Sequence, residues 1–259
     1  MAGEFAGKTV LVTGSSGIGL GAALKFAQES AQVYVCGIDD ELNEMAHDAG
    51  DSLDFHVSKV DVSDQDEVSN WISGITETTS AIDVLVNAAA IQTYGTIETT
   101  DISHWDRVMA INLRSCYLTS HYAYPHMKAR GGGSIIHVSS VQGHANQNEV
   151  LAYATTKGAI HALTRAMAVD CAKDNIRVNS ISPGSIRTPL LEFAAQTVAG
   201  EGEDIEPVIA GFGEAHPLGR VGTVEETSNL IAFLASDRAG FCTGGDYLID
   251  GALTAHIGV

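Results

Sequence analysis

Residues 9–19 read TVLVTGSSGIG, a short apolar run followed by a glycine-rich turn. The run at 9–13 predicts a buried strand, and a helix is expected from about residue 17 to residue 30. Glycines between a strand and a helix allow a tight turn and a close approach of the backbone. The helix N-terminus that follows offers free N–H groups to a pyrophosphate. The stretch therefore indicates the first strand–turn–helix unit of a dinucleotide-binding sheet.

The same alternation continues along the chain. Further strands are expected at residues 32–38, 53–60, 82–87, 134–139 and 177–181, and helices at 41–49, 65–78, 103–129 and 151–173. We therefore predict an α/β fold with a single domain over residues 1–259: a Rossmann-type, doubly wound parallel sheet of about seven strands with helices on both faces. Residues 188–218 break the rhythm and predict a lid over the site, the alternative being a solvated surface excursion.

The composition excludes several classes of function. The net charge of −18 argues against nucleic acid and against anionic membrane surfaces, because both need clustered Lys and Arg. The start of the chain is too polar for a signal peptide, and no apolar run is long enough to span a membrane. The four cysteines are scattered, which favours buried thiols in a reducing cytoplasm. The histidines lack the spacing of known metal motifs, so no metal site is expected.

The candidate chemistry lies at Ser140, Tyr153 and Lys157. On a helix, Tyr153 and Lys157 are four residues apart and share one face. We expect the ammonium to lower the pKa of the phenol, which would make Tyr153 a proton acceptor for an alcohol. Ser140 follows the apolar run 135–139 and should lie at the carboxyl end of a strand, where open α/β sheets bind ligands.

These motifs, in this order, resemble the short-chain dehydrogenase/reductase family from Lys8 to Gly251. The likeness is carried by the glycine-rich turn, Asp61-Val62, Asn87-Ala88-Ala89-Ala90, Asn112, Ser140, Tyr153, Lys157, Pro183-Gly184 and Gly244-Gly245. It implies transfer of a hydride between a nicotinamide cofactor and a C–OH group. Two departures stand out: the turn is one residue shorter than the family pattern, and Asn-Ala-Ala-Ala replaces the usual Asn-Asn-Ala-Gly.

The resemblance also implies roles for individual residues. Tyr153 would be the general acid/base, Lys157 would tune it and bind the nicotinamide ribose, and Ser140 would hold the substrate oxygen. Asn112 would link Lys157 to a proton-relay water. The cofactor-binding residues would be Gly14, Ser16, Gly17, Ile18, Gly19, Ile38, Asp39, Asp61, Val62, Asn87, Ala88, Ala89, Tyr153, Lys157, Pro183, Gly184, Ile186 and Thr188.

The choice of cofactor depends on the end of the second strand. Gly37 stands where NAD-preferring relatives usually have an acid, which resembles NADP-type members. Yet Ile38 follows where an Arg would be expected, and Asp39 and Asp40 would repel a phosphate dianion. We therefore expect NAD.

The polar segment 142–149 lies between Ser140 and Tyr153 and is expected to border the substrate. The substrate-binding candidates are Gln92, Ser140, Gln142, His144, Asn146, Tyr153 and Arg187. Amide and imidazole groups suit several hydroxyls, and the segment resembles that of bacterial sugar dehydrogenases. We expect a small-molecule sugar or polyol, with oxidation of an aldose C1 to the lactone as the most concrete prediction.

Three points stay open at this stage. The 142–149 segment has the alternative of being a hydrated rim that does not contact substrate. The alternative enzymatic activity is reduction of a small ketone or 3-oxoacyl compound. A non-catalytic dinucleotide sensor is the alternative of another class. Helices 103–129 and 151–173 would form subunit contacts in a homotetramer or homodimer, as in similar proteins.

Overall fold

The computed structural model describes residues 3–79 and 81–257. Its sheet has the order β3-β2-β1-β4-β5-β6-β7, and every neighbouring pair is parallel. The strands are β1 (Thr9–Thr13), β2 (Gln32–Gly37), β3 (Phe55–Lys59), β4 (Val84–Asn87), β5 (Gly133–Val138), β6 (Ile176–Pro183) and β7 (Asp246–Ile249). The prediction of one doubly wound α/β domain with about seven parallel strands is confirmed.

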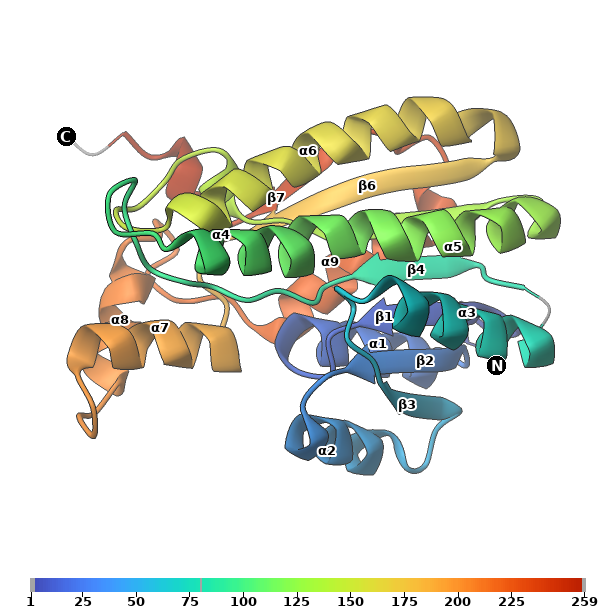
Figure 1. Ribbon diagram of the computed structural model, residues 1–259, viewed down its shortest axis with the longest axis horizontal. Coiled ribbons are helices and arrows are strands. Elements are labelled where there is room, and N and C mark those ends of the chain that lie inside the picture. Colours follow the sequence, from blue (N-terminus) through green and yellow to red (C-terminus); the bar gives the residue numbers. More distant parts are fainter. Residues whose placement is uncertain (1–2, 80, 258–259) are drawn as a thin grey trace.

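Helices cover both faces of this sheet (Figure 1). On one side α1 (Gly17–Gln28) and α9 (Val224–Ala235) pack together, and α2 (Asp40–Gly50) lies beside α1. On the other side lie α3 (Gln65–Thr79), α5 (Ser115–Arg130) and α6 (Leu151–Cys171). None of the helices in the described ranges combines the length and the apolar character needed to cross a membrane.

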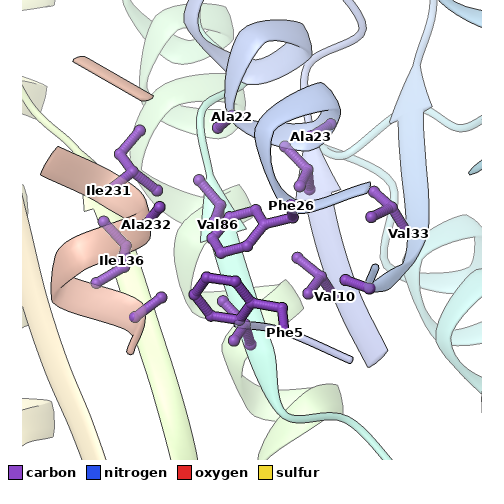
Figure 2. Packing of buried hydrophobic residues seen from close by; sticks show 14 of the residues in the cluster. Phe5, Val10, Ala22, Ala23, Phe26, Val33, Val86, Ile136, Ile231 and Ala232 are labelled. Carbon is purple, nitrogen blue, oxygen red and sulfur yellow. The ribbon is translucent and has the colours of Figure 1, made fainter. Parts of the chain in front are cut away.

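Side chains along β1 alternate between the two faces of the sheet, so the molecule has two hydrophobic cores, one on each face. Val10 and Val12 point to the α1 and α9 side, whereas Leu11, between them, points to the α3 and α5 side. Figure 2 shows the first core, in which Phe26 of α1 packs between the sheet and α9. The rings of Phe5 and Phe26 meet edge to face with centroids 4.7 Å apart, the geometry that aromatic quadrupoles favour.

The expected helix at 103–129 is divided into three segments. It consists of α4 (Ile102–Val108), a π-helical segment (Met109–Arg114) and α5. A π-helix closes its hydrogen bonds over five residues instead of four, so its turn is wider than an α-helical one. Asn112 lies within this wide turn and is buried against the end of β4.

The topology fixes where a ligand can bind. The chain runs outward from β1 to β2 and β3, then returns to β4 on the other side of β1. Open sheets bind ligands at such a switch point, beyond the carboxyl ends of the strands. Residues 188–218 form α7 (Pro189–Ala199) and α8 (Glu206–Glu214), which lie beyond this edge, at the left of Figure 1.

Candidate active site

A cavity of about 840 Å³ lies at the carboxyl edge of the sheet. It runs past the carboxyl ends of six strands, β1 to β6, and includes the glycine-rich turn after β1 and Ser140, Tyr153 and Lys157 beyond β5. Most sequence-predicted residues line it: Gly14, Ser16, Gly17, Ile18, Ile38, Asp39, Asp61, Val62, Ala88, Ala89, Gln92, Ser140, Gln142, Tyr153, Lys157, Pro183, Gly184, Ile186 and Thr188. The topology therefore gathers into one cavity residues that are up to 174 positions apart, from Gly14 to Thr188.

The catalytic candidates lie together where α6 meets the end of β5. Tyr153 and Lys157 are 7% and 3% exposed, and the Lys157 Nζ lies 5.2 Å from the centre of the Tyr153 ring. This ammonium donates a 2.8 Å hydrogen bond to the carbonyl oxygen of Val138, the last residue of β5. The helix thus holds the phenol and the ammonium on one face, as the spacing predicts.

Ser140 starts a short 3₁₀ turn just after β5. Its hydroxyl accepts a 3.1 Å hydrogen bond from the backbone N–H of Gln142, which fixes the Oγ at the edge of the cavity. The hydroxyl faces the Tyr153 phenol and lowers the pKa of that phenol. A strand end therefore presents an O–H group to the place where the phenol acts.

Burial governs the charges of this pair. It raises the pKa of Tyr153 to about 12, and it lowers the pKa of Lys157 to about 8. The sequence-based expectation that Lys157 lowers the pKa of the phenol is wrong for this structure. Both side chains are buried away from water. Burial disfavours the charged form of each, the phenolate of Tyr153 and the ammonium of Lys157.

Asn112 stands behind the cavity and not in its lining. Its Oδ1 accepts from the N–H of Ile91 at 2.8 Å, and its Nδ2 donates to the Ile91 carbonyl at 2.9 Å and to Thr156 Oγ1 at 3.3 Å. The side chain therefore joins the segment after β4 to α6, one residue before Lys157. Its contacts position the catalytic helix, and a link from Asn112 to Lys157 through water stays a prediction.

The glycine-rich turn accepts a ligand because two of its residues lack side chains. Gly14 has φ +98°, and a Cβ there would lie 3.2 Å from the backbone N of Ala89. A Cβ on Gly19 would lie 2.2 Å from the Gly14 carbonyl oxygen. The first turn of α1 therefore packs directly on the chain that precedes it. Gly19 therefore allows the close packing of α1 on the turn, and it does not line the cavity.

Asn87 also lies below the cavity, at 3% exposure. Its Oδ1 accepts from Thr119 Oγ1 at 2.7 Å, and its Nδ2 lies 3.2 Å from His137 Nδ1. The amide is thus used within the core, which differs from the expected direct contact with a cofactor. The alanines that follow it do line the cavity, and the Thr13 hydroxyl accepts from the N–H groups of both Ala88 and Ala89.

The end of β2 is shaped by close packing around Gly37. A Cβ on Gly37 would lie 2.1 Å from Ser15 Oγ and 2.6 Å from Asn43 Oδ1. This Asn43 oxygen is buried and accepts no hydrogen bond within the described part of the chain. Ile38 is 60% exposed, and the Asp39 carboxylate accepts from the N–H of Leu42 at 2.9 Å as the N-cap of α2.

The other end of the cavity has one apolar and one polar side. Leu191, Ala194 and Val198 of α7 and Phe212 of α8 form the apolar side. The polar side consists of Gln92, Tyr94, Arg107, Gln142, Gln147, Asn148 and Glu149. Sequence reasoning did not single out Tyr94 and Arg107. Each lies in a loop or helix whose approach to residues 140–153 depends on tertiary packing.

Three substrate candidates lie outside the cavity lining. Arg187 forms ion pairs with Glu192 at 2.9 Å and Glu206 at 2.8 Å, and so ties α7 to α8. His144 turns away after the 3₁₀ turn, and its Nε2 lies 2.7 Å from Asp246 Oδ2 on β7. Asn146 is exposed on the outer side of the same loop. These three side chains were expected to bind substrate, and their observed positions outside the cavity lining do not match that expectation.

Comparisons with known proteins agree with this geometry. The family described as Enoyl-(Acyl carrier protein) reductase matches residues 12–254. The uncharacterized oxidoreductase YxbG of Bacillus subtilis (strain 168) is 38% identical over 98% of this chain and 93% of its own. A cyclohexanol dehydrogenase of Acinetobacter sp. (strain SE19) is 33% identical over 98% of each chain. The ligand-free aldohexose dehydrogenase of Thermoplasma acidophilum superposes with a TM-score of 0.91 at 34% identity, over 99% of this chain and 97% of that one.

Proposed function

Because the chain belongs to the short-chain dehydrogenase/reductase family, we propose that it is an NAD-dependent oxidoreductase that oxidises a ring hydroxyl of a sugar. Oxidation of an aldose at C1 to the lactone is the specific reaction we propose. The observation that carries the proposal is the meeting of Ser140, Tyr153 and Lys157 at one end of a cavity whose other end is the glycine-rich turn.

The residues around the hydroxyl would divide the work as follows. A bound nicotinamide would supply the hydride acceptor for the carbinol carbon. Ser140 Oγ would hold the substrate oxygen, and the deprotonated Tyr153 Oη would take its proton. Lys157, whose Nζ is held by the Val138 carbonyl, lies beside the Tyr153 ring at which this proton is exchanged. Since burial raises the pKa of Tyr153 to about 12, the phenol carries its proton at neutral pH. Oxidation should therefore accelerate as pH rises, and reduction should need no such increase.

The shape of the cavity fits a dinucleotide. The first turn of α1 offers N–H groups that have no partner within the helix, and Ser16 leaves them without a side-chain cap. Gly14 lines the cavity, and its lack of a side chain lets the turn pack against the backbone of Ala88 and Ala89. Family members typically use a nicotinamide dinucleotide, and these residues suit its pyrophosphate.

Features near Gly37 support NAD over NADP. The buried Asn43 Oδ1 is an acceptor, which suits a ribose hydroxyl better than a phosphate dianion. Ile38 brings no positive charge to the cavity, and Asp39 adds a carboxylate. Replacing Ile38 with Arg should raise the use of NADP relative to NAD, and an unchanged ratio of kcat/KM values would count against this explanation.

Two sides of unlike polarity support a cyclic substrate. The amides of Gln92, Gln142 and Asn148 and the carboxylate of Glu149 can bind several hydroxyls, as a sugar requires. The similarity to an aldohexose dehydrogenase supports the same class.

The apolar side favours a second candidate, a cyclic secondary alcohol. Leu191, Ala194, Val198 and Phe212 suit a hydrocarbon ring, and a cyclohexanol dehydrogenase is among the relatives. A pyranose and a cyclohexanol share the reacting unit, a CH–OH group that belongs to a six-membered ring. They differ in how much of the ring is polar.

The decisive experiment measures NADH and NADPH formation with a panel of aldoses, polyols and cyclic alcohols. Activity that is highest with an aldose and yields the lactone supports the proposal, whereas a preference for cyclohexanol supports the second candidate. Tyr153→Phe serves as the matched inactive control. Tight NAD binding without turnover of any alcohol or ketone would instead favour the sensor.

We further propose that the enzyme works as a homotetramer or homodimer in the cytoplasm. Tyr117 on α5 and Val169 on α6 are 53% and 79% exposed, which supports contacts through these two helices. The buried thiols of Cys36, Cys116 and Cys171 suit a reducing compartment. Light scattering of the purified protein at several concentrations tests the assembly, and a monomer throughout would refute it.

A further inference from the structure

Two histidines and an aspartate converge beside the ends of β5 and β6, and none of the three lines the substrate cavity. His144 Nε2 lies 2.7 Å from Asp246 Oδ2, and His161 Nε2 lies 3.5 Å from Asp246 Oδ1. One ligand atom from each of the three residues lies within 4.8 Å of the other two. The three come from a loop, from α6 and from β7, so only the fold brings them together.

The cluster is built into the fold. His161 and Asp246 have side chains that are 7% and 14% exposed, whereas His144 is 40% exposed and leaves a path to solvent. A Cβ on Gly143 would lie 2.4 Å from His161 Cε1, so the glycine lets the loop close directly over that ring. The His144 and His161 rings are stacked with centroids 4.4 Å apart.

Serine hydroxyls fix the carboxylate. Ser180 donates to Asp246 Oδ1 at 2.6 Å, and Ser182 donates to both carboxylate oxygens at 3.0 and 2.8 Å. Such outer contacts orient the ligands of many metal sites. Ser182 and Ser139 also lie 3.0 and 2.8 Å from His161 Nε2, so either hydroxyl or a water is near enough to complete a fourth position.

The donor set selects the kind of ion. Two imidazoles and one carboxylate suit a borderline transition-metal ion, whereas Mg²⁺ and Ca²⁺ prefer oxygen ligands throughout. With zinc–ligand distances of about 2.0–2.2 Å, the donors of a tetrahedral site lie about 3.3 Å apart. The separations of 2.7 Å from His144 to Oδ2 and of 3.5 Å from His161 to Oδ1 lie on either side of this value, and all three ligand atoms lie within 4.8 Å of one another. Rotations of His144 and His161 that bring the two imidazoles toward one carboxylate oxygen would admit the ion.

We propose that His144, His161 and Asp246 bind one zinc ion, which fastens the 142–149 loop to α6 and β7. The ion would take the place of the proton that now joins each imidazole to its acceptor. Gln142, Gln147, Asn148 and Glu149 of this loop line the substrate cavity. The ion would therefore hold the polar side of that cavity in place without touching substrate or cofactor.

The test uses the chelator-treated full chain. Zn²⁺ is titrated against its thermal unfolding, and Co²⁺, which has a visible spectrum, replaces Zn²⁺ as a probe of coordination. The wild type should bind one ion per chain with the strong visible bands of tetrahedral Co²⁺. Saturating Zn²⁺ should raise the Tm by about 5–10 °C.

His144→Ala is the first variant, because this side chain is exposed and its loss should leave the fold intact. It should weaken metal binding by at least roughly 100-fold and abolish the shift in Tm. His56→Ala is the matched control, since His56 Nε2 lies 2.8 Å from Asp54 Oδ1 in an exposed pair that no third ligand completes within residues 3–79 and 81–257. It should bind Co²⁺ and Zn²⁺ as the wild type does.

Two results would overturn the assignment. One is a wild type that gives neither tetrahedral Co²⁺ bands nor a shift in Tm, which would leave a hydrogen-bonded cluster. The other is equal binding by His144→Ala and the wild type, which would place the ion elsewhere. Asp246→Asn separates the ligand role from the structural one, because an amide keeps the size of the side chain and loses the charge that the ion requires.

Discussion

Replacement of Lys157 by Met tests whether the ammonium is as poorly solvated as the structure indicates. Lys157 is 3% exposed, and its side-chain hydrogen bond goes to the carbonyl of Val138. Burial lowers its pKa from 10.5 to about 8. Below pH 8 both the folded and the unfolded chain carry this proton. Between pH 8 and pH 10.5 the folded chain has lost it and the unfolded chain still holds it. Stability of the wild type must therefore rise with pH across this window.

The size of the effect follows from the same shift. Each pKa unit corresponds to about 1.36 kcal/mol, so the full difference is about 3 kcal/mol. About 1.4 kcal/mol of it should appear between pH 7 and pH 9. Lys157→Met has no proton to lose, so its profile lacks this contribution. At pH 7 the loss of the Val138 contact, about 1–3 kcal/mol, offsets the relief from burying a charge. The variant should then be as stable as the wild type, or up to about 2 kcal/mol more stable.

The assay is urea unfolding of both proteins at several pH values, from which the difference in free energy of unfolding is taken. This subtraction removes the contributions of other groups that titrate in the same range. Lys59→Met is the control, because Lys59 is exposed and paired with Asp40 at 2.6 Å. A wild type that does not gain on Lys157→Met as pH rises would refute the reasoning, and so would an equal gain over Lys59→Met.

Three further changes test other parts of the site. Tyr153→Phe should lower kcat by about 10²–10⁴-fold, because the proposed proton transfer needs the phenol oxygen. NAD binding, followed by fluorescence titration, should stay within a few-fold, because the ring that lines the cavity is kept. Residual turnover near the wild-type rate would contradict this role. Gly19→Ala should weaken NAD binding by at least roughly tenfold. The new Cβ would lie 2.2 Å from the Gly14 carbonyl oxygen and would force the turn open. An unchanged affinity for NAD in the same titration would disprove this prediction. Asn112→Ala should lower the free energy of unfolding, measured in urea, by about 2–3 kcal/mol, because it leaves the N–H and C=O of Ile91 without their partners. A loss below about 0.5 kcal/mol would mean that water replaces both contacts.

Local pattern was sufficient to locate six of the seven strands, whereas β7 and α9 were not placed from the sequence. Residues 9–13 form β1 as expected, and the other five predicted strands and the 17–30 helix agree with the structure to within a few residues at each end. Buried parallel strands are continuous apolar runs, and the glycine-rich turn marks the first junction, so both signals are local. The grouping of Ser140, Tyr153 and Lys157 at one end of the cavity was predictable for a similar reason. Helical spacing aligns Tyr153 with Lys157, and a strand end presents Ser140.

Properties that depend on contacts distant in sequence could not be predicted. The imidazole of His144 is chemically suited to bind a substrate hydroxyl. Its direction is set instead by its contact with Asp246, which lies 102 positions away in the sequence. Arg187 similarly pairs with Glu206 across α7 and α8. The pKa of Tyr153 was predicted in the wrong direction because the spacing shows the charged neighbour and does not show the loss of water. Desolvation is a property of the whole fold, and here it raises the pKa of the phenol more than the hydrogen bond from Ser140 lowers it.

The short glycine-rich turn and the missing acid at the end of β2 are best understood as one structural change. In sequence they are two departures, 22 positions apart, that seem to concern different parts of a dinucleotide. In the structure Ser15 Oγ occupies the space where a side chain on Gly37 would begin, because a Cβ there would lie 2.1 Å away. With Ser15 in this place, residue 37 must be glycine whatever the cofactor. Gly37 is therefore no sign of a 2′-phosphate. Under the proposed preference for NAD, the polar side chain that lines the cavity beside Gly37 is Asp39.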